Sequence, residues 1–347
     1  MARRIRKSLW GRSLQRTLGA LTRSTLRSGT RAVMAASAQA LKAAAQASPA
    51  GPRQLPAGAG NWLSGAAIGP AGARRYRLFK PPGAHESVPL PLLVMLHGCD
   101  QDAAAFARST RLQALAARAG FMLLFPEQDR LANAQGCWNW FETRSGRAFT
   151  EAASLIATID QACALHGADP ARVAIAGMSA GASMAAFTAL HYPDRFKAVA
   201  MHSGIAPGSA HSTATALGAM QGRHTPHPLK PTAELPPLLV IQGTADHLVR
   251  ARNGLAAAQL WADAAGASPG APRTVQRGAR RAMTLTDFKR HGRLAATLCE
   301  VAGLGHAWSG GAASQPWGDA TGPDASRLIW AFAARRFRRQ AQSAAKQ

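Results

Sequence analysis

The residues best suited to chemistry lie in the string Gly177-Met178-Ser179-Ala180-Gly181. This string directly follows the apolar run 172–176 and directly precedes an alanine-rich stretch with helical character. A strand that turns abruptly into a helix needs glycines around the turn, because larger side chains would collide there. The turn exposes the serine, and the helix N-terminus adds positive potential beside it. We predict that Ser179 is a nucleophile, the alternative being a glycine-rich packing turn.

A serine hydroxyl needs a histidine base and a carboxylate that orients it, in the chain order serine, acid, histidine. Asp246 follows the apolar run 236–243, and His306 lies in a glycine-rich loop after an expected β-hairpin at 283–302. Taken alone, Asp246 could equally be a turn aspartate and His306 a loop histidine. Because both follow Ser179 in the expected order, we predict that the three residues form a triad. Three other carboxylates suit the role less, because one ends a helix and two follow the histidine: Asp194, Asp319 and Asp324.

An acyl-transfer intermediate also needs backbone N–H donors, one after the nucleophile and one from a loop after an earlier strand. These donors are predicted to be Ala180 and Cys99. Gly98 permits a close backbone turn beside Cys99, and His97 is expected to tie the loop down by hydrogen bonding. We reject Cys99 itself as the nucleophile, because that reading leaves the serine turn unexplained.

Three tryptophans flank the predicted site in the sequence, and each is a candidate for substrate contact: Trp138, Trp140 and Trp308. Flat aromatic surfaces suit an aliphatic polyester and an aromatic acyl group equally well. The alternative is that these large side chains fill the core.

The elements that must position these residues alternate in type from residue 90 onward. Short apolar runs at 91–98, 120–128, 172–177, 197–204 and 236–243 predict buried strands, and the stretches 103–119, 150–166, 180–191 and 252–265 predict helices. This order indicates an α/β protein with a doubly wound, mostly parallel sheet and helices on both faces. Each candidate catalytic residue follows a strand, where such folds bind ligands.

Composition narrows the class of protein further. The chain has 347 residues, 47% of them hydrophobic, which suits one large domain plus an extension. Its four cysteines include no CxxC pair, so we expect no structural zinc site. No run of about 18 apolar residues occurs, so we expect no transmembrane segment.

The sequence predicts a basic N-terminal extension at 1–72, with an amphipathic helix and then a linker, a catalytic domain at 73–340 that ends in a basic helix, and a tail at 341–347. The first acidic residue is Glu86, and fifteen of the 41 Lys and Arg precede it. The extension has three readings: a solvated tail, an anchor on a granule or another anionic surface, and an export signal. We do not expect nucleic acid as a partner, because aromatic residues are scarce in the extension.

With these residues assembled, the chain from about 74 to 339 resembles the polyhydroxybutyrate depolymerase family of esterases, within the α/β-hydrolase fold. The resemblance rests on the strings LHGCDQDA, FPEQ, CWNWF, GMSAGASM, QGTADHLV and GLGHAWSGG, which occur in the family's order. It implies a serine hydrolase of carboxylic esters, with Ser179, Asp246 and His306 as its triad and with no metal or organic cofactor. It also implies a disulfide between Cys99 and Cys137.

The resulting expectation is a serine esterase that forms an acyl-enzyme and hydrolyses poly(3-hydroxybutyrate) or its oligomers. The alternatives are a feruloyl or acetylxylan esterase, and a non-catalytic surface-binding protein on a hydrolase scaffold. No separate substrate-binding domain is evident after the catalytic one, which favours a cytoplasmic or granule-associated enzyme, with a secreted enzyme as the alternative.

Overall fold

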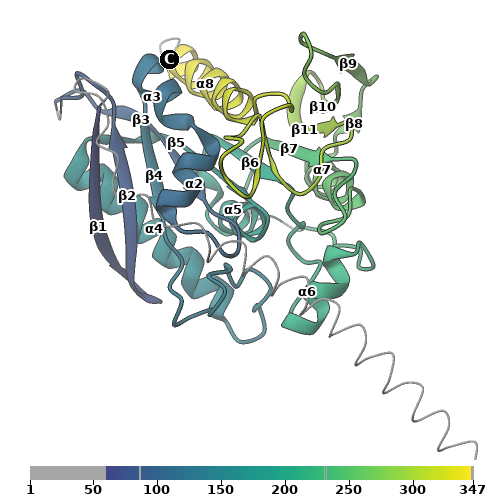
Figure 1. The fold of residues 1–347 in the computed structure, drawn as a ribbon, viewed down its shortest axis with the longest axis horizontal. Coiled ribbons are helices and arrows are strands. Elements are labelled where there is room, and N and C mark those ends of the chain that lie inside the picture. The colour runs from purple at the N-terminus through teal and green to yellow at the C-terminus, as the bar shows by residue number, and fades with distance from the viewer. Residues whose placement is uncertain (1–59, 86, 230, 232, 345–347) are drawn as a thin grey trace, which may run out of the picture. The chain divides into compact units, whose positions relative to one another are not determined.

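The computed structural model describes residues 60–344 except 86, 230 and 232. The expected amphipathic helix and most of the basic extension lie outside the described residues. The described part is built on one large twisted sheet with helices on both sides (Figure 1). The doubly wound α/β arrangement expected from the sequence is therefore confirmed.

The sheet has eleven strands in the order β1-β2-β4-β3-β5-β6-β7-β11-β10-β8, and β9 pairs with β10. Its centre is parallel, because β4, β3, β5, β6, β7 and β11 all run in the same direction. The central strands are β3 (Leu90–Leu96), β4 (Met122–Pro126), β5 (Ala168–Met178), β6 (Ala198–His202) and β7 (Leu238–Gly243). They read as continuous apolar runs because helices cover both of their faces.

Two cores lie on the two faces of the sheet. One core joins the sheet to α4 (Arg147–His166), α5 (Ala180–His191) and α7 (Arg252–Ala265), with Trp261 fully buried in it. The other joins it to α2 (Ala103–Thr110), α3 (Leu112–Ala119) and α8 (Ala325–Ala344), around Phe106 and Phe332. Each helix therefore contributes an apolar face to one of two cores.

The remaining elements complete the edges and loops. The expected β-hairpin at 283–302 is present as β10 (Met283–Arg290) and β11 (Arg293–Val301). The short elements are η1 (Pro193–Arg195), α6 (Thr213–Met220), β8 (Ser268–Pro269), β9 (Arg273–Val275), β12 (Trp308–Ser309) and β13 (Gly318–Asp319).

The structure corrects two expected boundaries. The sheet begins with β1 (Asn61–Gly69), which pairs antiparallel with β2 (Gly72–Lys80), so the fold starts before residue 73. The expected helix at 103–119 is two helices, because Arg111 adopts a left-handed conformation with φ of 52° between them. No glycine or proline marks that break in the sequence.

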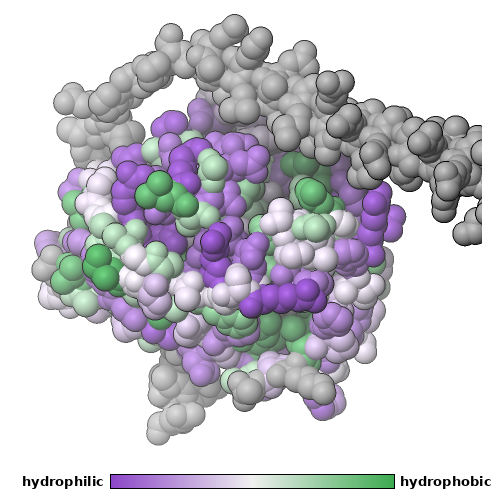
Figure 2. Space-filling view, turned by 90° about the horizontal axis from the view of Figure 1, so that it is seen from below, coloured by the Kyte–Doolittle hydropathy of each residue, from purple (hydrophilic) through white to green (hydrophobic). Residues whose placement is uncertain are grey.

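Hydrophobic side chains on the face shown in Figure 2 form separate patches among hydrophilic ones. Large exposed apolar residues in the described part of the chain include Leu131, Leu217 and Leu248. Such scattered exposure is normal for a folded domain. Among the described residues, none of the helices has the length and apolar character needed to span a membrane.

Candidate active site

Ser179 occupies a strained turn between β5 and α5. Its φ of 55° and ψ of −123° are conformations that side-chain-bearing residues rarely adopt. A Cβ on Gly177 would overlap the backbone of Gly181, and a Cβ on Gly181 would overlap the carbonyl oxygens of Leu96 and His97. Both glycines of the motif are therefore required sterically, and the start of α5 lies close to the end of β3.

Strand register brings the three predicted catalytic residues to one edge of the sheet. Met178 pairs with His202 on β6, and His202 pairs with Ile241 on β7. On the far side of β7, Gly243 pairs with Val301 of β11. Ser179, Asp246 and His306 lie one, three and five residues beyond Met178, Gly243 and Val301, so all three leave the sheet at the same carboxyl edge.

Asp246 and His306 form a hydrogen-bonded pair with 2.8 Å between Asp246 Oδ2 and His306 Nδ1. The Asp246 side chain is fully buried and that of His306 is 9% exposed. Burial by itself raises the pKa of Asp246, but hydrogen bonds from His306 and from the amides of Val249 and Leu248 outweigh it and hold that pKa below its ordinary value. Asp246 is thus an ionised acceptor, and His306 Nδ1 is its donor.

In the neutral ring, a hydrogen on Nδ1 leaves His306 Nε2 without one, which is the form that a general base needs. Ser179 is partly exposed, and within the described residues its hydroxyl forms no hydrogen bond. Contacts between nucleophile and base are often formed only with substrate bound. No other protein group in the described residues therefore holds the hydroxyl.

The loop after β3 lies against the serine turn. A Cβ on Gly98 would be 3.5 Å from Ser179 Cβ and 3.6 Å from the carbonyl oxygen of Met178. In the described part of the chain, neither the Cys99 N–H nor the Ala180 N–H has a protein acceptor. Two free donors beside a serine are what a developing oxyanion requires.

Several contacts hold this loop in place. Cys99 and Cys137 form a disulfide, and Asp100 N donates to Gln135 O at 2.8 Å. The buried His97 donates from Nδ1 to Gly98 O at 2.8 Å, since its Nε2 accepts from Gln128 N at 3.1 Å. Burial lowers the pKa of His97 to about 4, so the ring is neutral near pH 7. The disulfide and the hydrogen bonds together fix where the Cys99 N–H points.

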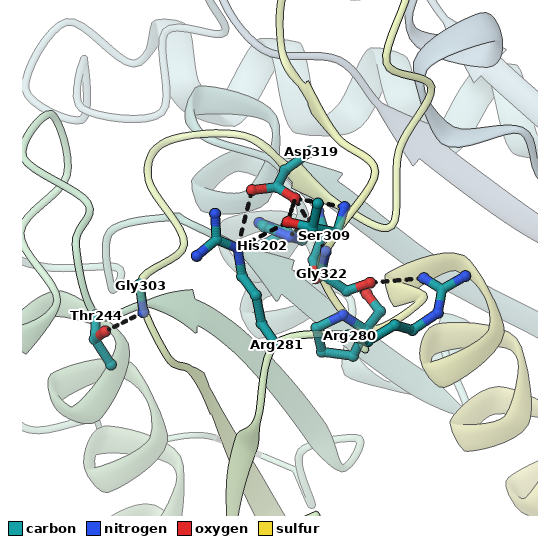
Figure 3. Close-up of polar contacts among 10 residues, drawn as sticks. His202, Thr244, Arg280, Arg281, Gly303, Ser309, Asp319 and Gly322 are labelled. Carbon is teal, nitrogen blue, oxygen red and sulfur yellow. Dashed lines mark hydrogen bonds and ion pairs between the residues drawn. The ribbon is translucent and has the colours of Figure 1, made fainter. Parts of the chain in front are cut away.

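His202 performs a similar task for the loop that carries His306. Its Nε2 accepts from Ser309 N at 3.0 Å, so Nδ1 carries the hydrogen and donates to Ser203 Oγ at 3.1 Å. The ring stacks on Trp308 with centroids 5.0 Å apart. Burial, with His306 nearby, lowers the pKa of His202 to about 3. A neutral histidine on β6 thus anchors the loop at Ser309 (Figure 3).

A buried polar network that sequence reasoning missed supports the segment around Cys137. Glu151 on α4 accepts from Gln128 Nε2 at 2.8 Å and from Asn139 N at 3.0 Å. Arg74 on β2 donates to Gln128 Oε1 and lies over the Trp138 ring, 5.1 Å from its centroid. Both charged residues are almost fully buried. The available signal in the sequence was a lone charged residue, Glu151, at the helical spacing of the residues that α4 buries.

The structure corrects the expectation that the three tryptophans contact substrate. Trp138 and Trp308 are fully buried, and Trp140 is 5% exposed. Trp138 Nε1 donates to His97 O at 3.1 Å, and Trp308 Nε1 donates to Ser326 Oγ at 3.1 Å. Buried indoles with satisfied N–H groups are core residues, and these brace the loops on either side of the site.

The other carboxylates near the motifs have structural partners. Asp319 pairs with Arg281 at 3.2 Å, and Asp324 accepts from the Arg327 amide at 3.0 Å in the first turn of α8. Among the described residues, no group of three His, Cys, Asp or Glu side chains is placed to hold a metal ion.

A serine turn, a buried Asp–His pair and two free backbone donors at the carboxyl edge of a doubly wound sheet characterise α/β-hydrolases. The fold is confirmed by a solved acetyl xylan esterase from Aspergillus awamori, which has a TM-score of 0.57 at 18% sequence identity and covers 71% of this chain and 94% of its own. The chain thus has the α/β-hydrolase fold.

Residues 74–236, just under half of the chain, match the family described as esterase PHB depolymerase. Poly(3-hydroxyalkanoate) depolymerase C of Paucimonas lemoignei is 41% identical over 115 residues, or 33% of this chain and 28% of that protein. Feruloyl esterase B of Neurospora crassa is 29% identical over 193 residues, or 50% and 65%. The resemblance seen in the motifs is confirmed, and the relatives carry the names of ester hydrolases. The chain spans less than two thirds of either relative.

Proposed function

We propose that this chain is a serine esterase in which Ser179, His306 and Asp246 act as nucleophile, base and orienting acid. The observation that carries the proposal is the hydrogen bond between His306 and the buried Asp246. This pair lies at the edge of the sheet where β5 ends, directly before Ser179. The pair supplies a base of the correct tautomer, and the strained turn supplies an accessible hydroxyl.

The reaction then proceeds in two acyl-transfer steps. His306 Nε2 takes the proton of Ser179 while Oγ attacks the ester carbonyl, and the oxyanion is stabilised by the N–H groups of Cys99 and Ala180. His306 gives the proton to the leaving alcohol, whose bond to the acyl carbon breaks. Water, deprotonated by His306, then releases the acid and regenerates Ser179. Asp246 holds the imidazole in place and stabilises its charged form.

The proposed substrates are esters of 3-hydroxybutyrate, either the polymer or its oligomers. The support is the match of residues 74–236 to the depolymerase family and the identity of 41% to a depolymerase. Feruloyl or acetylxylan esters are the second candidate, because the chain also resembles a feruloyl esterase and shares its fold with an acetyl xylan esterase.

Covalent labelling with a fluorophosphonate tests the nucleophile directly. The reagent reacts only with an activated serine, so the unaltered chain should be labelled at Ser179. The Ser87→Ala variant is a matched control, because Ser87 is exposed in the loop before β3, at the opposite edge of the sheet. Labelling that survives in Ser179→Ala, or absence of labelling in the unaltered chain, would contradict the proposal.

A further inference from the structure

Trp317 is the aromatic side chain that lies beside the catalytic imidazole. Its ring centroid is 6.0 Å from that of His306, and the two planes meet at 82°. Unlike the three buried tryptophans, Trp317 is partly exposed. We propose that Trp317 contacts the alcohol portion of the bound ester and sets the preference of the enzyme for that portion. This inference rests on the function proposed above.

The alcohol portion is favoured over the acyl portion because of the role of His306. The imidazole must lie within hydrogen-bond reach of the leaving oxygen to protonate it. The carbonyl oxygen points instead toward the N–H groups of Cys99 and Ala180. Any group attached to the leaving oxygen therefore extends from the neighbourhood of the His306 ring, and the indole of Trp317 lies beside that ring.

Backbone pairing fixes Trp317 in this position. Trp308 N donates to Trp317 O at 2.7 Å, and the next residue, Gly318, pairs with Trp308 in the short sheet of β12 and β13. A Cβ on Gly318 would overlap the carbonyl oxygen of Ala312, so this close turn requires glycine. The indole is thus placed by the segment that follows His306, and the two side chains belong to one loop.

Asp319 organises the far side of this loop, as Figure 3 shows. Its Oδ1 accepts from Thr321 N at 2.8 Å and Gly322 N at 3.0 Å, while Oδ2 pairs with Arg281. Arg281 comes from the segment before β10, outside the loop. Asp319 therefore holds the segment just after Trp317 in place, and it is a positioning residue.

The predicted effect is one of binding rather than chemistry. An indole that packs on an apolar alcohol group contributes about 1.4 kcal/mol, or tenfold in affinity. For esters of a bulky alcohol, such as p-nitrophenol, Trp317→Ala should therefore raise KM about tenfold with little change in kcat. For methyl esters of the same acid, KM should stay within about twofold, because little alcohol surface is present.

The experiment measures kcat and KM for two ester series, one varying the alcohol at a fixed acyl group and one varying the acyl group at a fixed alcohol. The variants are Trp317→Ala and Trp317→Phe, with Trp330→Ala as a control. Trp330 is also partly exposed, but it lies in α8 and stacks on Phe121, the residue just before β4. Only the Trp317 variants should change the alcohol series, and phenylalanine should restore most of the loss.

Two further readouts separate this inference from the proposed function. The leaving group of a fluorophosphonate is fluoride rather than an alcohol. Trp317→Ala should therefore be labelled at nearly the rate of the unaltered chain. If Trp317→Ala fails to fold, Trp317→Leu, which removes the flat ring but keeps an apolar side chain, should still raise KM in the alcohol series. An equal loss of activity toward every ester would overturn the inference about Trp317. If the same variant is still labelled, the serine mechanism stands. Absence of labelling in the unaltered chain would overturn both.

Discussion

His306 Nδ1 lies 2.8 Å from Asp246 Oδ2, although sixty positions separate the two residues in the chain. The contact depends on β11 running parallel to β7, since this pairing sends the loops after both strands out of the same edge of the sheet. The antiparallel strand β10 makes that direction possible, because it returns the chain to the start of β11.

Asp246→Asn should lower kcat about 10³–10⁴-fold while the fold persists. An amide in this position favours the wrong tautomer of His306, so Nε2 carries a hydrogen and cannot accept the serine proton. The measurement is ester hydrolysis under single-turnover conditions. Asp287→Asn is a control, because the pKa of Asp287 is also held low, against its burial, by Thr297 and Arg273, but Asp287 lies in β10, outside the proposed triad. Comparable activity loss in both variants would contradict the assigned role.

Removal of the Cys99–Cys137 disulfide should weaken both stability and turnover. The bridge closes a loop with a sequence separation of 38, for which the chain-entropy estimate is about 3–4 kcal/mol of unfolding free energy. The Cys99→Ser, Cys137→Ser double variant keeps the Cys99 N–H but frees the loop, so kcat should fall by about tenfold. Denaturant unfolding and esterase assays measure the two effects. Unchanged kcat would show that the hydrogen bonds of His97 and Asp100 suffice.

His202 should make stability depend on pH in mildly acidic solution. Burial, together with His306, lowers its pKa from 6.5 to about 3, so the unfolded chain binds a proton there that the folded chain does not. Its contribution is complete above pH 6.5 and is lost as the pH falls toward 3, with a slope of about 1.4 kcal/mol per pH unit. His202→Gln should lower the slope of unfolding free energy against pH by about that amount, measured by urea unfolding at several pH values, while His97, whose pKa is also lowered, keeps its own contribution. An unchanged slope would contradict a buried, neutral His202.

Glu151→Gln should destabilise the chain by about 1–3 kcal/mol, because the new amide group would face existing donors. Glu151 accepts from Gln128 and from both the backbone and the side chain of Asn139, and all three residues are buried. Glu142→Gln is the control, since Glu142 is a partly exposed glutamate before the same helix. Thermal unfolding of both variants makes the comparison, and equal melting temperatures would exclude a supporting role for the network.

The sequence predicted the central sheet well because parallel strands leave a clear local signature. Buried runs between helices stand out, and α5 occupies 180–191 as expected. By contrast, β1 was missed, because its alternating exposure and its glycine and alanine residues hide its pairing with β2. The break at Arg111 was also missed. No local residue type marks its left-handed conformation, which depends on tertiary packing.

Candidate residues could be located, but their surroundings could not. Motif order singled out Ser179, Asp246 and His306, and strand register places their loops at one edge. The tryptophans show the limit of such reasoning, because a motif does not say which way an indole faces. Trp308 is buried against His202, whereas Trp317, which no motif marked, lies beside His306.

The most direct test of the account is the hydrolysis of p-nitrophenyl butyrate and 3-hydroxybutyrate oligomers by the unaltered chain, Ser179→Ala and Ser87→Ala. We expect turnover by the unaltered chain and by Ser87→Ala, and a loss of several orders of magnitude in Ser179→Ala with its unfolding free energy little changed. Turnover that persists in a folded Ser179→Ala variant would contradict the assignment of Ser179 as the nucleophile.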